Sequence, residues 1–261
     1  YDWPGYDYLM QAEAGYLHLT GEPGSPPARV GLSMIDFMTG ITGALAIVAS
    51  VMRARATGAG CDVDVSLFDV AIHQLSYPGI WYLNERLRTE RQPRSAHPNA
   101  VPVQLYRTAD GWIFLMCMTE KFWAELVDIL ADDSLRTDHR FLTMSDRKLH
   151  REVLTERLDS LLMARSTEEW MGFFRSRLPA APVLDLAQAL ENPYLNRIGM
   201  VRNVPHPHRE DLRTLSSPIK IDGRRADSKV CSALGADTAA ILRDAGMSDA
   251  EIAVLMANGA C

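Results

Sequence analysis

The stretch VGLSMIDFMTGITGALAIVASVMRARATGAG, residues 30–60, contains the longest apolar run of the chain and is its strongest fold signal. Apolar and small residues fill it from Met34 to Ala56, and Gly58 then follows in the manner of a glycine C-cap. We therefore predict one long helix over residues 34–56. Its most apolar part, residues 41–52, is shorter than the roughly 20 residues that span a bilayer, so no membrane segment is expected.

Asp36 is the only acidic residue of this predicted helix and lies in its first turn. The pattern Ser33-x-x-Asp36 is typical of a helix N-terminus, with Ser33 as the cap and Asp36 interacting with backbone N–H groups. The same position suits a nucleophile, because amides at a helix N-terminus also stabilise negative charge on a nearby reacting oxygen. Local pattern alone leaves both interpretations open.

The composition is that of an ordinary soluble globular protein, with 47% hydrophobic and 23% charged residues in a chain of 261. A net charge of −6 argues against a nucleic-acid partner. Four cysteines are scattered without a CxxC pair or a histidine at metal-ligand spacing, which predicts reduced thiols, a cytoplasmic location and no metal site. His206 and His208, in PHPHRE, are expected in a surface loop.

Four segments follow one another along the chain. Residues 1–83 contain predicted helices over about 4–20, 34–56 and from 66 onward, with a short strand at 61–65. Residues 84–97 are charged and proline-containing, and are predicted to be a linker. Residues 98–185 predict a small α+β domain, which opens with a hairpin around Ala109-Asp110-Gly111 and includes a Ser166/Glu169 capping box. Residues 186–261 mix short strands with turns and end in a helix capped by Ser248 and Glu251.

Four quoted segments, in order along nearly the whole chain, carry a family resemblance. They are PGYDYLMQAEAGYLHLTGEP (4–23), the long stretch through VSLFD (30–69), HPNAVPVQLYRTADGWIFL (97–115) and LGADTAAILRDAGMSDAEIAVL (234–255). Together they resemble the class III CoA-transferases, which include formyl-CoA transferase and carnitine CoA-transferase. The 2-methylacyl-CoA racemases share that fold.

The resemblance implies an α/β fold, with part of a Rossmann-like large domain plus a small α+β domain, in an intertwined homodimer. Residues 186–261 would return to the large domain begun by residues 1–83. The family's opening βα unit and its CoA-contacting basic residues have no counterpart here. We therefore expect that N-terminal sequence is absent.

The resemblance also implies a reaction, in which an acyl-CoA:carboxylate CoA-transferase uses Asp36 as nucleophile and forms an aspartyl-CoA thioester. Coenzyme A and acyl-CoA would be substrates, with a small carboxylic acid as acceptor and no permanently bound cofactor. The apolar neighbours of Asp36 would exclude water from the intermediates. Tyr6 and Asp7 match a tyrosine–acid pair near the family's active site, and His97 is a candidate substrate contact.

Two alternatives remain beside the transferase. The racemases carry a histidine where this chain has Tyr6, and a tyrosine with a pKa of about 10 is a poor general base at neutral pH. A non-catalytic CoA-binding homologue is the other alternative. The family's glycine-rich lid is not found between residues 84 and 103, which argues against oxalate as acceptor. The segment from Pro93 onward most resembles transferases of branched C4–C5 dicarboxylates, such as the mesaconyl-CoA enzymes.

Overall fold

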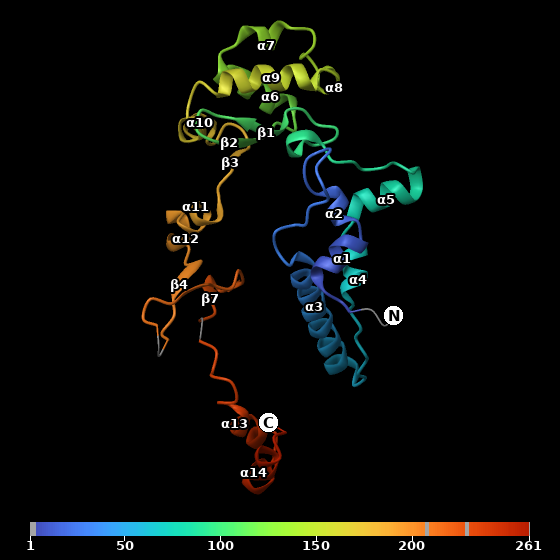
Figure 1. Ribbon diagram of the computed structural model, residues 1–261, viewed down its shortest axis with the longest axis vertical. Helices are drawn as coiled ribbons and strands as arrows, with labels where there is room; N and C mark the ends of the chain where they lie inside the picture. The colour runs from blue at the N-terminus through green and yellow to red at the C-terminus, as the bar shows by residue number, and fades with distance from the viewer. Residues whose placement is uncertain (1–3, 207–208, 228–229, 261) are drawn as a thin grey trace. The chain divides into compact units, whose positions relative to one another are not determined.

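The computed structural model describes residues 4–206, 209–227 and 230–260 (Figure 1). The chain divides into two compact units, residues 1–183 and 184–261. Helices are combined with small antiparallel sheets in a mixed α/β architecture, as expected.

Five helices form the N-terminal part of the first unit. They are α1 (Asp7–Glu13), α2 (Tyr16–Leu19), α3 (Met34–Thr57), α4 (Leu67–His73) and α5 (Ser76–Glu85). Two of the predicted helices are each split in two, because Gly15 at φ 87° and Ser76 at φ 51° adopt left-handed backbone that a continuous helix excludes. Helices α1, α3 and α4 enclose a small core in which Ile35 and Ala71 are fully buried.

Helix α3 confirms the predicted long helix. It ends at Thr57, where Gly58 has φ 74° and donates its N–H to the carbonyl oxygen of Ala54 at 2.8 Å. Its most apolar window has a mean hydropathy of 1.7 and is only 6% buried, so by length and composition alone this helix of 24 residues could cross a membrane. The expectation based on residues 41–52 underestimates the apolar length, because the helix continues on both sides. One such helix is weak evidence for a membrane span, because a mostly buried core helix of a soluble protein or a signal sequence can have the same length and hydropathy.

Residues 61–65, predicted as a strand, are irregular and lead directly into α4. A lone strand is not stable without a partner to complete its hydrogen bonds, and no described part of the chain pairs with this one. Helix α4 then begins at a local signal, since Ser66 Oγ accepts the N–H of Asp69 at 3.0 Å.

The small α+β domain is built on a three-stranded antiparallel sheet, β1 (Val103–Arg107), β2 (Trp112–Met116) and β3 (Ala180–Pro182). The predicted hairpin is confirmed, with Leu105 opposite Phe114. Five helices accompany the sheet, and α6 and α9 lie over one of its faces (Figure 1). These helices are α6 (Glu120–Leu130), α7 (Asp133–Thr137), α8 (Met144–Leu149), α9 (Arg151–Leu162) and α10 (Thr167–Phe174).

Arg147 is fully buried in the mainly apolar interior of this domain. Its guanidinium donates to the carbonyl oxygens of Val101 at 3.0 Å and Phe141 at 2.9 Å, and to Glu120 Oε1 at 2.7 Å. It also lies 4.6 Å from the ring centroid of Trp123. Every partner is suited to a cation, which is why the charge is tolerated inside.

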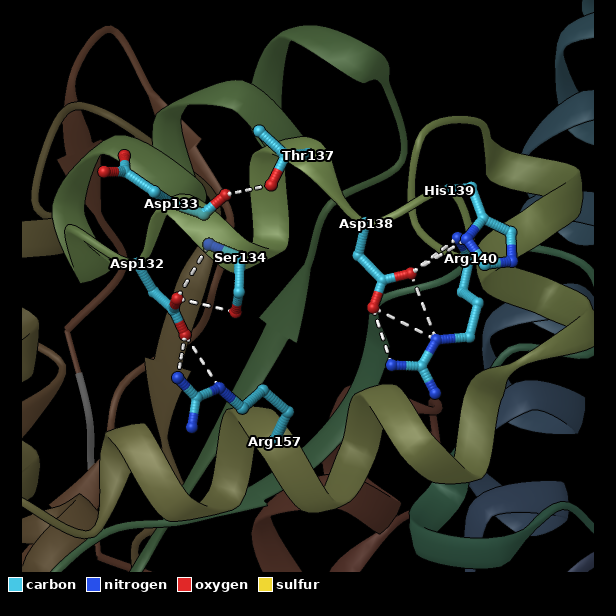
Figure 2. Close-up of polar contacts among 8 residues, drawn as sticks. All are labelled: Asp132, Asp133, Ser134, Thr137, Asp138, His139, Arg140 and Arg157. Atoms are coloured by element: carbon cyan, nitrogen blue, oxygen red, sulfur yellow. Dashed lines mark hydrogen bonds and ion pairs between the residues drawn. The ribbon is translucent and has the colours of Figure 1, made fainter.

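Carboxylates hold both ends of α7 (Figure 2). Asp132 accepts the Ser134 N–H at 3.0 Å and forms an ion pair with Arg157 at 2.5 Å. At the other end, Asp138 pairs with Arg140 at 2.6 Å, and hydrogen bonds from that side chain are the first cause that lowers the pKa of Asp138 to about 2. These contacts stabilise the connections of the helix and form no site of their own.

The predicted linker contains the short helix η1 (Pro93–Ser95). Its side chains form bonds both to the N-terminal helical part and to the small domain. Arg91 donates to several carbonyl groups of residues 17–26, including those of His18 at 2.6 Å and Ser25 at 2.8 Å. Arg94 forms an ion pair with Asp159 of α9 at 2.6 Å. Residues 84–97 therefore connect two parts of the first unit and are held to both of them by side-chain contacts.

The second unit is built from short elements. They are α11 (Leu186–Leu190), α12 (Pro193–Arg197), β4 (Val201–Asn203), β5 (Arg213–Leu215), β6 (Lys220–Ile221), β7 (Arg224–Arg225), α13 (Thr238–Asp244) and α14 (Asp249–Ala257). The strands form two antiparallel pairs, β4 with β5 and β6 with β7. The predicted cap of the last helix is confirmed, because Ser248 and Glu251 form a complete capping box, as do Ser166 and Glu169 at α10.

Candidate active site

The start of α3 is held by Asp7, a residue of α1. Asp7 is 4% exposed, and its Oδ2 accepts the backbone N–H groups of Ile35 at 2.6 Å and Asp36 at 3.1 Å. Its Oδ1 accepts from Gln11 Nε2 at 2.6 Å. A carboxylate at this point both satisfies free amides and meets the positive end of the helix dipole. Asp7 therefore caps α3 from another helix.

Ser33 occupies the predicted N-cap position, but the expectation that its side chain caps the helix is wrong. No capping bond forms from its hydroxyl, and the buried Asp7 carboxylate takes the two amides instead. The Phe37 N–H donates to the Ser33 carbonyl oxygen at 3.2 Å. The amides of Ile35, Asp36 and Phe37 are thus all engaged, and they are not free to stabilise a reacting oxygen.

Asp36 lies in the first turn of α3, as predicted, with its own side chain exposed. It follows Ile35, which is fully buried against α1 and α4, and it precedes Phe37, which is 69% exposed. The described residues hold the backbone of Asp36 but do not enclose its carboxylate. The water-excluding pocket expected around it is therefore not formed by this part of the chain alone.

Tyr6 precedes α1 at its N-cap position, and its side chain is 68% exposed. Its carbonyl oxygen accepts the Met10 N–H at 3.0 Å. Tyr6 is thus brought near the site through its neighbour Asp7, while its phenol group extends into solvent.

His97 lies in a turn that it helps to form. Its Nδ1 accepts the N–H groups of Asn99 at 3.1 Å and Ala100 at 3.0 Å, and its carbonyl oxygen accepts from Arg151 Nη2 at 2.7 Å. Among the described residues, no hydrogen bond or ion pair joins His97 to Asp7 or Asp36. The ring acts here as a local turn acceptor at the beginning of the small domain.

Gln11 was not foreseen as part of the site. Its side chain is fully buried and contacts both Asp7 and the residues that precede α3. The available signal was its spacing, because residues four apart on a helix face one another and Asp7 and Gln11 are such a pair.

No group of three or more His, Cys, Asp or Glu side chains suited to a metal ion occurs within residues 4–206, 209–227 and 230–260. His206 lies in irregular chain, and His208 lies outside the described residues. The site at the start of α3 is accordingly one of carboxylates and amides.

Comparison with known proteins assigns the chain to a family. Residues 1–238 match the sequence model of CoA-transferase family III. An acyl-CoA transferase of Fusarium pseudograminearum is 31% identical, over 98% of this chain and 57% of its own length. A succinyl-CoA:mesaconate CoA-transferase of Haloarcula marismortui is 27% identical, over 84% of this chain and 54% of its own length.

The fold is similar to that of a CAIB/BAIF family protein of Brucella suis, with a TM-score of 0.78 and 27% identity. The similarity covers 92% of this chain and 62% of that structure. The chain spans a little over half the length of the curated relatives it matches. Because the family model matches most of its residues, the chain belongs to CoA-transferase family III.

Proposed function

We propose that this chain is part of an acyl-CoA:carboxylate CoA-transferase in which Asp36 is the nucleophile. The observation that carries the proposal is the position of Asp36 in the first turn of α3, where buried Asp7 fixes the backbone amide of Asp36 itself. Covalent catalysis by a carboxylate needs that group held in a defined direction towards the thioester. Membership of the family supports the same reaction.

In the proposed cycle, an Asp36 oxygen attacks the carbonyl carbon of the donor thioester. The C–S bond breaks, CoA leaves as thiolate, and a mixed anhydride remains. The thiolate then attacks the aspartyl carbonyl carbon, which releases the donor acid as carboxylate and forms the aspartyl-CoA thioester. An acceptor carboxylate repeats both steps in reverse order, so the new acyl-CoA leaves and Asp36 is regenerated.

The supporting residues act through position. Asp7 caps the start of α3. Tyr6 directly precedes Asp7, at the N-cap position of α1. Because Asp7 occupies the amides of Ile35 and Asp36, other groups must stabilise the oxyanion of each tetrahedral step.

A further part of the protein must exclude water, since the anhydride and thioester would otherwise hydrolyse. Exposed apolar side chains cover α3 and its surroundings, among them Phe37, Ile41 and Leu45, each about 70% exposed. An area of this kind is typical of a surface that is covered in the complete assembly. We propose that the active protein is a homodimer in which this surface and Asp36 are enclosed.

We further propose that donor and acceptor are small dicarboxylic acids. Several relatives are named for such acids, including succinyl-CoA:mesaconate and succinyl-CoA:glutarate CoA-transferases at 27–28% identity. His97 remains a candidate contact through its ring Nε2, because its Nδ1 and its backbone N–H and carbonyl oxygen already form hydrogen bonds within the chain.

The experiment is to trap the acylated enzyme. The full-length protein is incubated with succinyl-CoA, quenched with hydroxylamine and digested, and mass spectrometry should find the hydroxamate on Asp36. Asp36→Asn should abolish both the adduct and acyl exchange, a loss of at least about 10³-fold. Asp62→Asn, which alters an exposed aspartate outside any helix, is the matched control and should retain activity. An adduct on another residue, or full exchange in Asp36→Asn, would refute the mechanism.

The same protein distinguishes the two alternatives. A racemase would exchange the substrate α-proton with deuterated water in the absence of an acceptor acid. A non-catalytic homologue would bind acyl-CoA without exchange, and Asp36→Asn would bind it equally well.

A further inference from the structure

Gln11 connects three parts of the site through one side-chain amide. Its Nε2 donates to Asp7 Oδ1 at 2.6 Å and to the Leu32 carbonyl oxygen at 3.3 Å. Its Oε1 accepts the Val30 N–H at 2.9 Å. The side chain is fully buried, so these bonds are made where water does not compete.

Only an amide satisfies these partners. The Asp7 carboxylate and the Leu32 carbonyl accept, whereas the Val30 N–H donates, so the group between them must do both. This also fixes which end of the Gln11 amide is nitrogen. A glutamate would lack the donor, and a methionine would lack the donor and offer only a weakly accepting sulfur.

The bonds of Gln11 lead to Asp36 by two routes. The first runs through Asp7, whose other oxygen holds the N–H groups of Ile35 and Asp36. The second runs through residues 30–32, the chain that enters α3 directly. Both routes determine where the helix begins, and Asp36 lies within its first turn.

We propose that Gln11 is a positioning residue for the nucleophile. It holds the Asp7 carboxylate in the orientation that caps α3 and fixes residues 30–32 relative to α1, and so sets the direction of Asp36. This role rests on the proposed function of Asp36, and Gln11 itself touches no reacting atom. Misplacement of a catalytic group by about 1 Å can cost about a hundredfold in rate. Loss of the Gln11 amide should therefore lower kcat more than it alters KM.

The test compares Gln11→Met and Gln11→Glu with wild type in the full-length protein, with Gln74→Met, an exposed glutamine at the end of α4, as control. Both Gln11 variants should lower kcat for acyl exchange at least tenfold, with the KM for acyl-CoA changed by less than about twofold. Hydrogen exchange of peptides spanning residues 30–38 should accelerate at least tenfold, while the small domain stays protected.

A reversed pair, Asp7→Asn combined with Gln11→Glu, provides a second readout. The amide introduced at position 7 can donate to the carboxylate introduced at position 11 and still accept the α3 amides through its oxygen. The new carboxylate also accepts the Val30 N–H. The Leu32 carbonyl oxygen still lacks its donor, so protection of residues 30–38 should recover in part relative to Gln11→Glu alone. Hydrogen exchange reports on structure alone. This readout therefore stays valid even if the reaction itself needs the negative charge of Asp7.

The proposal is overturned if both Gln11 variants keep kcat within about twofold of wild type. It is also overturned if kcat falls while exchange of residues 30–38 is unchanged, or if protection is lost equally throughout the chain. Failure of the proposed function has a different signature, because wild type would then give no Asp36 adduct whatever the Gln11 variants do.

Discussion

Replacing Arg147 by methionine tests whether its buried charge holds the small domain together. The guanidinium is fully buried and bonds to two backbone carbonyl groups, those of Val101 and Phe141, as well as to Glu120. Methionine keeps much of the apolar volume but donates no hydrogen bond. The backbone carbonyls cannot be removed with it, so they remain buried without these donors.

The expected loss follows from these contacts. Each carbonyl left without a donor costs about 1–3 kcal/mol, and the cation–π contact with Trp123 is worth about 1–2 kcal/mol. Relief from desolvating the guanidinium offsets part of this loss. The bond to Glu120 adds less than about 1 kcal/mol, because that side chain is 57% exposed and screened by water. We expect the free energy of unfolding to fall by about 3 kcal/mol.

For a chain of this size, about 3 kcal/mol lowers Tm by about 9 °C, which thermal circular dichroism of the full-length protein would measure. Arg136→Met is the matched control. Arg136 is 54% exposed and pairs with the half-exposed Asp128. The Tm of the Arg136→Met variant should therefore differ from wild type by no more than about 2 °C. A fall of less than about 3 °C for Arg147→Met, or one equal to the control, would refute the reasoning.

The pKa of Asp138 is lowered from 3.8 to about 2, first by the hydrogen bond from the Arg140 side chain. The folded state therefore gains stability from the Asp138 carboxylate above pH 3.8, and this gain is lost as the pH falls towards about 2. Asp138→Asn should therefore lower Tm at neutral pH, with a difference from wild type that narrows below about pH 4, and a constant difference would contradict this. Burial raises the pKa of Cys117 to about 12, so iodoacetamide at pH 8 should alkylate exposed Cys61 in the native protein but Cys117 only after denaturation. Equal labelling rates would show that Cys117 is accessible. Arg91→Met should accelerate hydrogen exchange of residues 17–28 about tenfold and Arg91→Lys by less, whereas unchanged exchange would mean that the Arg91 bonds do not hold this loop.

Features fixed by neighbouring residues were predictable from sequence. Helix α3 follows from an apolar run closed by Gly58, and the β1–β2 hairpin from two apolar runs around Asp110-Gly111. The capping box at Ser248 is equally local. By contrast, the strand expected at residues 61–65 depended on a partner strand, and the pattern within the segment contains no information about one.

The candidate site shows the same division. The resemblance identified Asp36 and Asp7 as members, and the structure brings the Asp7 carboxylate to the amide of Asp36. The resemblance could not reveal this contact, because local pattern favoured Ser33 as the cap. The buried carboxylate of Asp7, 28 positions before Ile35, took that role. Gln11 was missed for a related reason, since a glutamine in a helix has no special meaning until its partners are known. Competition between a local serine and a buried acid is decided by tertiary packing, which a single sequence does not contain.

The cap that Asp7 provides has a consequence for protein engineering. Residues 30–57 can be transplanted into another scaffold as a helix, but the transplanted helix would begin without the group that defines its first turn. The smallest portable version of this site is α1 and α3 together with the chain between them, which includes α2. A recombination point or insertion placed between α1 and α3 must therefore preserve the distance between the two, or the nucleophile is carried along without its orientation.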